Sequence, residues 1–300
     1  MKHQTHVSFI GAGEIGSALV TLISHSGAQI EQWDVDSSKV PHQKSLETVV
    51  SEADILFFCV PSWILRVAVK PILPHLKKKT LCVFVSKGIE TKTHLLIDGL
   101  ARDILPKGQP IALLSGPMLA EELIDGHGGA ACVGTKSLAD FKRLDAIFSE
   151  QDLHLTFASD MKSVAVAGVL KNIYAIALGI AAGLEWGDNR KGWLVAECVQ
   201  EMITIMRALK ADPSYALSQA GLGDFMATGM STYSSNHSVG RALATSSTCE
   251  IKSEGCQSLP SLVKKLGTKT VKTLPVIQAL RAVLENGANT KETFEELFHC

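Results

Sequence analysis

A strand–turn–helix pattern at the start of the chain constrains the fold more than any other feature. The apolar run VSFI (7–10) leads directly into GAGEIG (11–16), and a helical pattern, SALVTLIS (17–24), follows. In such a turn the first glycine permits a tight bend, the second lets the backbone approach a pyrophosphate, and the third lets helix and strand pack closely. Because amide groups at a helix N-terminus attract anions, Gly11, Gly13 and Gly16 are predicted to bind a dinucleotide.

Glu14 and Ile15 complete the predicted cofactor-binding turn. The carboxylate of Glu14 suits the positive end of the helix dipole. Beside a bound diphosphate, however, its negative charge must point away from the ligand, or it weakens the site.

An acidic residue ends the second predicted strand, AQIEQW (28–33). It is Asp34, 18 residues after Gly16. A carboxylate at this place accepts hydrogen bonds from the adenosine ribose and repels a 2′-phosphate. The sequence therefore predicts NAD as the cofactor, with NADP as the alternative. Asp36 is a rival for the same role, and either acid could be a simple turn residue.

Chain length and charge limit the class of protein. A chain of 300 residues suits two domains of ordinary size, and 46% hydrophobic residues provide for a substantial core. The formal net charge of −1 gives no overall attraction to nucleic acid or to an anionic membrane. No long apolar signal region precedes the first motif, so we expect a cytoplasmic protein.

One long apolar segment, Val164–Gly183, is nearly long enough to span a bilayer. Lys171 and Asn172 fall at its centre, where hydrocarbon would penalise both side chains. A buried helix between domains is therefore expected rather than a membrane span.

The seven cysteines show no spacing typical of a metal site, and we expect no bound metal. Cys59, Cys82, Cys132 and Cys198 lie inside apolar runs, where a reduced thiol behaves as a small hydrophobe. The whole set, which also includes Cys249, Cys256 and Cys300, is interpreted as structural free thiols in a reducing compartment.

Short apolar runs alternate with helical patterns through the first half of the chain. Continuously apolar strands are typical of a parallel sheet that is covered on both faces. The alternation predicts right-handed crossovers and a doubly wound Rossmann sheet over residues 1–160. After about Asp160 the pattern is helical, so residues 161–300 are predicted to form an all-helical substrate or catalytic domain. The predicted strands are 7–11, 28–33, 54–60, 80–86, 110–116, 130–134 and 153–158.

Several further motifs follow the glycine turn in a fixed order. They are VSKG (85–88), SGPMLAE (115–121), LKNIYA (170–175), GDN (187–189), GLGD (221–224) and SSN (234–236). Together and in this order they resemble the NAD(P)-dependent glycerol-3-phosphate dehydrogenases. The resemblance extends from the first glycine turn to about Gly255, which is most of the chain.

The resemblance implies a role for each matching residue. Lys171 matches the family's proton acceptor. Lys87 matches a contact to both cofactor and substrate, whereas Ala120 and Glu254 match cofactor contacts. Asp224 and Asn236 match residues that contact glycerol 3-phosphate, and Gly116 and Ser234 lie in the substrate motifs.

The residue type of Lys171 agrees with the role that the resemblance implies. It is one cation in an apolar helix, and burial disfavours the charged form of a lysine, which lowers its pKa toward neutrality. Such a lysine takes the proton of a secondary alcohol while hydride leaves the carbon, and returns it in the reverse direction. The alternative is a snorkelling or salt-bridged lysine.

The chain departs from the family pattern at three places. Ser235 stands where the family has an arginine, the natural phosphate anchor, and Met118 stands where bacterial members have a serine. The segment between Asp36 and Glu52 is also shorter than in the family. His237 or Arg241 could supply a substitute cation, although His237 could equally be a solvated loop residue.

These observations leave three hypotheses. The first is interconversion of sn-glycerol 3-phosphate and dihydroxyacetone phosphate with NAD(P). The second is a diverged dehydrogenase that acts on another small hydroxy compound, because Ser235 and Met118 both remove phosphate-side contacts. The third is a sensor that binds NAD without turnover. The expected partner is a small phosphorylated substrate, and the helical domain could form a homodimer.

Overall fold

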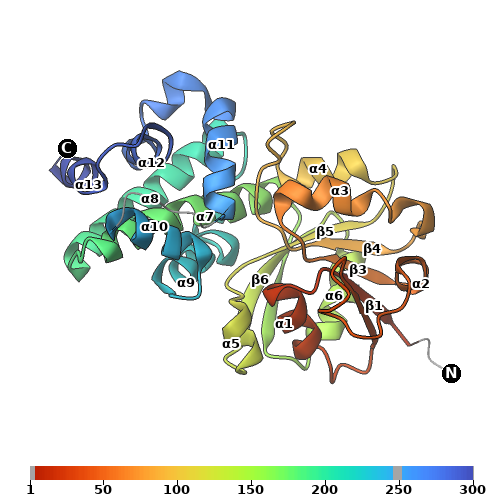
Figure 1. Cartoon of the computed structure of the whole chain (residues 1–300). Coiled ribbons are helices and arrows are strands. Elements are labelled where there is room, and N and C mark those ends of the chain that lie inside the picture. The colour runs from red at the N-terminus through yellow and green to blue at the C-terminus, as the bar shows by residue number, and fades with distance from the viewer. Residues whose placement is uncertain (1–3, 246–251, 300) are drawn as a thin grey trace. The chain divides into compact units, whose positions relative to one another are not determined.

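The structure is a computed structural model that describes residues 4–245 and 252–299. The chain divides into two compact units (Figure 1). The first unit extends to Lys87, resumes at Leu95 and ends at Ala165. The second combines the short segment Gly88–His94 with the described residues from Val166 onward.

The first unit is built on a sheet of seven described strands in the order β2-β1-β3-β4-β5-β6-β7. β1 to β5 run parallel to one another, and β1 lies between β2 and β3. This arrangement confirms the predicted doubly wound sheet. The strands are β1 (His6–Ile10), β2 (Gln29–Trp33), β3 (Ile55–Phe58), β4 (Leu81–Phe84), β5 (Ile111–Ser115), β6 (Gly129–Gly134) and β7 (Leu153–Ala158).

The sheet is not parallel throughout, which corrects one expectation. β5 pairs with β6 antiparallel, and β6 and β7 are parallel to each other. The reason is the connection between β5 and β6: it holds only the short helix α5 (Ala120–Ile124) and turns back, so no full crossover forms.

Helices cover both faces of this sheet, as Figure 1 shows. They are α1 (Glu14–Leu22), α2 (Leu46–Glu52), α3 (Leu65–Val69), α4 (Ile97–Ile104), α5 and α6 (Leu138–Phe148), with the short 3-10 turns η1 (Ser62–Ile64) and η2 (Leu73–His75). Residues 62–75 form three short helical pieces, η1, α3 and η2, rather than one helix. Pro74 lies inside the last of them, where a missing backbone N–H suits a short turn better than a continuous helix.

The strand interiors explain why the sheet is buried on both faces. β3 and β4 are buried at every residue. Phe9 stacks on Phe57 with ring centroids 4.6 Å apart, and Phe58 stacks on Phe84 on the other side of the sheet at 4.7 Å. These aromatic pairs bury apolar area between adjacent strands and fix their register.

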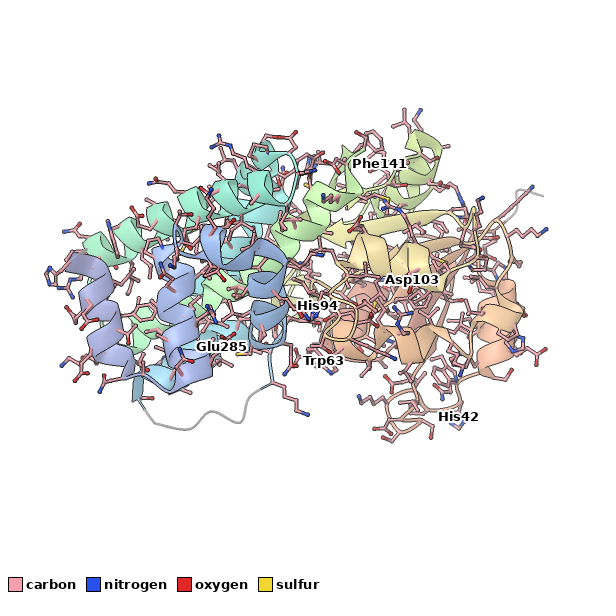
Figure 2. The ribbon with its side chains drawn as sticks, turned by 90° about the horizontal axis from the view of Figure 1, so that it is seen from above. His42, Trp63, His94, Asp103, Phe141 and Glu285 are labelled. Atoms are coloured by element: carbon pink, nitrogen blue, oxygen red, sulfur yellow. The ribbon has the colours of Figure 1, made fainter. Side chains whose placement is uncertain are left out.

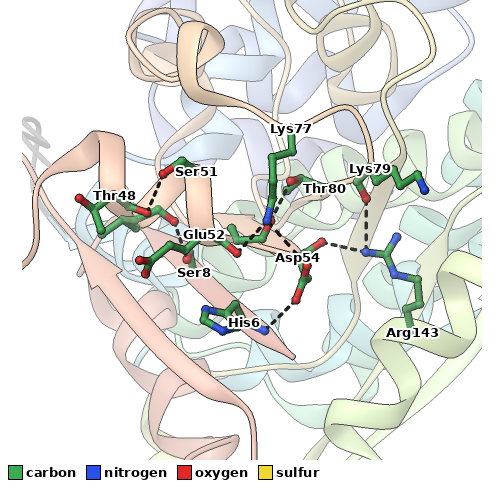
Figure 3. A network of polar contacts seen from close by, with 12 residues as sticks. His6, Ser8, Thr48, Ser51, Glu52, Asp54, Lys77, Lys79, Thr80 and Arg143 are labelled. Carbon is green, nitrogen blue, oxygen red and sulfur yellow. Dashed lines mark hydrogen bonds and ion pairs between the residues drawn. The ribbon is translucent and has the colours of Figure 1, made fainter. Parts of the chain in front are cut away.

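A polar network closes the amino ends of the strands (Figure 3). Asp54 is its centre: its carboxylate accepts from the backbone N–H of His6 at 3.1 Å, and Lys77 lies 3.8 Å away. Arg143 of α6 donates to the backbone carbonyl of Asp54 at 2.9 Å. These contacts satisfy backbone groups where strands begin, so we assign the network a structural role.

The second unit contains only helical elements among its described residues. They are α7 (Met161–Gly183, which begins in the first unit), α8 (Asp188–Ala208), η3 (Pro213–Leu217), the π-helical turn η4 (Gln219–Gly223), α9 (Asp224–Met230), α10 (Ser235–Thr245), α11 (Glu254–Val271), α12 (Pro275–Asn286) and α13 (Thr290–His299). The segment Gly88–His94 joins this unit through α11. The N–H of Ile89 donates to Ser258, and His94, labelled in Figure 2, is hydrogen-bonded to Ser261 at 2.9 Å.

α7 has the length and hydropathy of a membrane span, but every residue of its most apolar stretch is buried inside the protein. Burial all round explains why this helix is hydrophobic on every face. Gly179 and Gly183 let α10 approach closely, because a Cβ at Gly179 would lie 2.2 Å from the carbonyl oxygen of His237.

The described cysteines are free thiols, as predicted: Cys59, Cys82, Cys132, Cys198 and Cys256. Burial raises the pKa of the Cys59 and Cys82 thiols to about 12, so both are inert as nucleophiles. Cys249 and Cys300 lie outside the described residues.

Candidate functional site

The glycine turn has the geometry that the sequence predicts. Gly11 adopts a φ of 105°, and a Cβ there would lie 2.6 Å from the carbonyl oxygen of Cys59. A Cβ at Gly16 would lie 2.2 Å from the carbonyl oxygen of Gly11. At Gly13, in contrast, no described atom lies within 4 Å of that position. Two glycines are thus required by packing, and the third leaves open space where a diphosphate would approach.

Asp34 lies at the carboxyl end of β2 and is bonded to the glycine turn. Its Oδ2 atom accepts from the N–H of Ala12 at 2.7 Å, and its Oδ1 atom accepts from the N–H of Asp36 at 2.9 Å. The residue is buried. Each carboxylate oxygen keeps a second lone pair, so a ribose hydroxyl can still donate to it.

The rival acid, Asp36, is exposed and engaged locally. Its carboxylate accepts from the hydroxyl of Ser38 at 2.6 Å and from the backbone N–H of Ser38 at 3.1 Å, and these bonds lower the pKa of Asp36. Gln43 closes the loop that follows, because its amide exchanges two hydrogen bonds with the backbone of Asp34, at 2.8 and 2.9 Å. Asp36 therefore behaves as the turn residue, and Asp34 as the acid that faces the glycine turn.

Other predicted residues of the first unit lie at the same edge of the sheet. Lys87 follows β4 and Gly116 follows β5, and the Lys87 ammonium donates to the carbonyl of Gly116 at 3.0 Å. Ala120 begins α5, which packs against α1. Glu14 is exposed in the first turn of α1, whereas Ile15 packs against the core. In open α/β sheets, ligands bind outside the carboxyl ends of the strands, where these residues gather.

A buried ion pair lies inside the second unit. Lys171 of α7 and Asp224 of α9 are 7% and 2% exposed, and the Lys171 Nζ atom lies 3.0 Å from Asp224 Oδ1. The same Nζ donates to the hydroxyl of Thr228 at 2.7 Å, and that hydroxyl donates to Asp224 at 3.0 Å. Lys171 is therefore not the isolated cation that the sequence suggested. The Asp224 carboxylate offsets the cost of burying its charge.

Asp224 directly follows a π-helical turn, which places its side chain in this cluster. η4 carries the GLG of the GLGD motif, and the N–H of Gly223 bonds back to the carbonyl of Ser218. A Cβ at Gly221 would lie 2.4 Å from two backbone carbonyl oxygens, so the turn requires glycine there. Single π turns occur frequently at functional sites.

A second buried group, next to Lys171 in sequence, joins three helices. The Asn236 side chain of α10 donates to Asn172 Oδ1 of α7 at 2.9 Å, and its own oxygen accepts from the N–H of Gly255 at 2.9 Å. A Cβ at Gly255 would lie 2.5 Å from the carbonyl oxygen of Asn172. Glu254, the residue before this glycine, begins α11.

Ser234 is buried at the start of α10, and its hydroxyl accepts from the N–H of His237. His237 is also buried, which excludes the solvated loop residue considered above. Burial, with Arg241 and Lys191 nearby, lowers the pKa of His237, so at neutral pH it is a poor substitute for an arginine. Ser235 is exposed, and Met118 packs into the core of the first unit.

The structure thus collects the predicted residues into two groups, one in each unit. The sequence reasoning missed Thr228, which touches both members of the ion pair. Its position four residues after Asp224 was a usable signal, since residues at that spacing share a helix face. Among the described residues, no cluster of histidine, cysteine or acidic side chains could hold a metal ion.

Comparison with known proteins decides the family. A family model of the N-terminal part of NAD-dependent glycerol-3-phosphate dehydrogenase matches residues 35–140, and a model of its C-terminal part matches residues 160–295. The chain belongs to this family. The predicted family, and with it the class of NAD(P)-dependent oxidoreductase, is confirmed.

Individual relatives agree with the family models. The NAD(P)+ glycerol-3-phosphate dehydrogenase of Pseudomonas syringae pv. syringae is 28% identical over 329 positions, which cover 100% of this chain and 96% of the relative. Since this chain has 300 residues, at least 29 positions of the alignment have no counterpart here.

Solved structures of the family share the fold. Glycerol-3-phosphate dehydrogenase from Coxiella burnetii matches with a TM-score of 0.87 and 22% identity, covering 99% of each chain. The Plasmodium falciparum enzyme matches with a TM-score of 0.82 and 17% identity, covering 97% of this chain and 94% of that one. The predicted fold class, a Rossmann sheet followed by a helical domain, is therefore confirmed.

Proposed function

We propose that this protein interconverts sn-glycerol 3-phosphate and dihydroxyacetone phosphate with a nicotinamide dinucleotide. The observation that carries the proposal is the buried cluster of Lys171, Asp224 and Thr228. A buried ammonium held by a carboxylate and a hydroxyl is a proton donor of fixed position, which a protein that only binds NAD does not need.

The proton transfer follows from this cluster. In the direction of reduction, the Lys171 ammonium would donate a proton to the carbonyl oxygen, and a bound nicotinamide cofactor would supply the hydride. In the direction of oxidation, neutral Lys171 takes the proton of the alcohol, and Asp224 stabilises the ammonium that forms. Within the second unit, Asn236 and Ser234 would orient the substrate, whereas Lys87 and Gly116 of the first unit stay predicted contacts from the family resemblance.

The cofactor is proposed to bind at the glycine turn, since the open space at Gly13 fits a pyrophosphate. Glu14, Ile15 and Ala120 would complete its contacts within the first unit, whereas Glu254 of the second unit stays a predicted contact from the family resemblance. We propose NAD rather than NADP, because Asp34 places a fixed, buried negative charge beside the turn and would repel a 2′-phosphate. A cytoplasmic location and a homodimer, both expected from the sequence, stay predictions.

The test is the oxidation of NADH in the presence of dihydroxyacetone phosphate, followed by the loss of NADH absorbance. We expect turnover by the natural protein and none by Lys171→Met. NADPH in place of NADH should give a markedly lower kcat/KM. Cofactor binding without turnover on phosphorylated or free hydroxyketones would refute the enzymatic proposal.

A second candidate, a dehydrogenase of another small hydroxy compound, is favoured by Ser235 and Met118. Ser235 is exposed at the start of α10 and has room for a longer side chain. Ser235→Arg should lower the KM for dihydroxyacetone phosphate by roughly tenfold or more if this position faces phosphate, because a charge-assisted contact contributes about 1.5–3 kcal/mol. An unchanged KM, with faster turnover on an unphosphorylated hydroxyketone, would favour the second candidate.

A further inference from the structure

Helix α12 begins at a buried point without a capping side chain of its own. Its N-cap residue is Leu274, whose side chain cannot accept a hydrogen bond, and Pro275 has no N–H to offer. The next two N–H groups, of Val276 and Ile277, belong to residues that are fully buried. Such donors need acceptors, because a buried N–H without a partner costs free energy.

Glu201 of α8 supplies these acceptors. Its Oε1 atom accepts from the N–H of Val276 at 2.6 Å, and its Oε2 atom accepts from the N–H of Ile277 at 3.1 Å. The carboxylate also lies at the positive end of the α12 dipole. Burial of Glu201 raises its pKa to about 7, with a smaller contribution from Glu197, while its three hydrogen bonds act in the opposite direction.

A third donor connects Glu201 to the helix that carries Lys171. The hydroxyl of Tyr174 donates to Glu201 Oε2 at 2.8 Å, and Tyr174 is fully buried. Burial raises the pKa of Tyr174 well above its usual value, with contributions from Glu201 and Cys198, so the hydroxyl stays a donor. The ring of Tyr174 meets the ring of Phe225 edge to face, with centroids 6.3 Å apart.

The two rings lie on the two elements that form the ion pair. Tyr174 is three residues after Lys171 on α7, a spacing that puts both side chains on one face of the helix. Phe225 directly follows Asp224 on α9. α7 is therefore joined to α9 by the polar contacts of Lys171 with Asp224 and Thr228, and by an aromatic contact whose tyrosine is held by Glu201.

We propose that Tyr174 and Glu201 are positioning residues, whose hydrogen bond holds Lys171 and Asp224 in register through the Tyr174–Phe225 ring contact. The proposal rests on the proposed function insofar as Lys171 is the proton donor. Neither residue touches substrate in this account. Each acts through the placement of α7 against α9.

The test uses Tyr174→Phe, which removes one oxygen and keeps the ring, and Glu201→Gln, which keeps the shape and removes the charge. We expect kcat for reduction of dihydroxyacetone phosphate to fall about tenfold in both variants, with KM changed less than about twofold. A misplacement of a catalytic group by 1 Å costs roughly 100-fold in rate, and the tenfold loss of kcat expected here is smaller. Glu295→Gln is the matched control, since it weakens the hydrogen bonds of Arg190 to α13 in the same unit and should leave kcat unchanged.

A second measurement does not depend on turnover. The side-chain nitrogen of Lys171 is followed by NMR in protein with labelled lysine, and its signal is assigned by its loss in Lys171→Met. Its titration should move in Tyr174→Phe and Glu201→Gln, and not in Glu295→Gln. If the natural protein gives no turnover, the proposed function fails, and the NMR titration still decides the positioning role.

An unchanged kcat together with an unchanged Lys171 titration in folded Tyr174→Phe would overturn the proposal. If that variant does not fold, Phe225→Leu removes the ring contact from the other side and leaves the α12 cap intact. A wild-type Lys171 titration in Phe225→Leu would overturn the proposal equally.

Discussion

Replacing Asp224 with asparagine tests the charge that holds Lys171. The change keeps the shape of the side chain and removes the carboxylate charge that lies 3.0 Å from Lys171 Nζ. At this distance, Coulomb attraction in a medium of effective dielectric constant about 20 is about 5 kcal/mol. Removing one partner of a buried pair typically costs about 3–5 kcal/mol, because the other charge is left uncompensated.

Lys171 avoids this cost by releasing its proton at a lower pH. Removing the carboxylate therefore favours the neutral form of Lys171 over its buried ammonium. The pH at which reduction of dihydroxyacetone phosphate loses its proton donor should therefore move down. Above that pH, kcat for reduction should fall by roughly 100-fold or more, the usual contribution of a general acid.

The assay is the pH profile of kcat, measured with NADH and saturating dihydroxyacetone phosphate. Glu285→Gln is the matched control: it makes the same chemical change in a half-buried pair on α12, with Arg281 Nε at 2.9 Å, and Figure 2 shows Glu285 in that unit. Its pH profile should equal that of the natural protein. An Asp224→Asn protein with an unchanged pH profile and an unchanged melting temperature would refute the electrostatic role of Asp224.

Three further predictions concern other parts of the chain. Because the folded pKa of Glu201 is about 7, above its value of 4.5 in the unfolded chain, the folded state keeps a proton that the unfolded state has lost. The free energy of unfolding should therefore decrease by about 3 kcal/mol as pH rises from about 4.5 to about 7, and urea titrations of Glu201→Gln should lack this slope. Gly16→Ala should lower both the melting temperature and NADH affinity, whereas Gly13→Ala, with open space around its methyl group, should lower only the affinity. Arg190→Ala removes two hydrogen bonds to Glu295, so α13 should become more sensitive to proteolysis while kcat is unchanged.

The sheet and the glycine turn could be predicted because their signals are local. β1, β3, β4 and β5 are short and mainly apolar runs, and the turn needs glycine where a Cβ would lie 2.2–2.6 Å from a backbone carbonyl oxygen. The antiparallel direction of β6 could not be read in the same way. The direction of β6 depends on the path of the chain between Ser115 and Gly129. Hydrophobic periodicity indicates the type of an element and carries no information about that path.

The residues of the candidate site could be predicted from the sequence more easily than the groups to which they are hydrogen-bonded. Thr228 lies 57 residues from Lys171, and Val276 lies 75 residues from Glu201. Glu201 looks like one of several acids along α8, and only the fold reveals that it caps another helix. A sequence indicates which residue types are available for chemistry, whereas their pairing depends on tertiary packing, so buried polar contacts are the part of a site that sequence reasoning most often misses.

The substitution of the family's arginine by Ser235 lies outside the buried cluster of Lys171, Asp224 and Thr228. Lys171, Asp224 and Thr228 are all buried, and each bonds to the other two. Substituting one of these residues leaves a buried charge or hydroxyl without that partner, which lowers the free energy of unfolding. The cluster is therefore kept by its contribution to stability as well as by any role in catalysis. Ser235 is exposed, so exchanging an arginine for serine there costs little stability. The ion pair alone therefore cannot identify the substrate, and the Ser235→Arg experiment is the one that separates a glycerol-3-phosphate dehydrogenase from an enzyme that shares only its proton transfer.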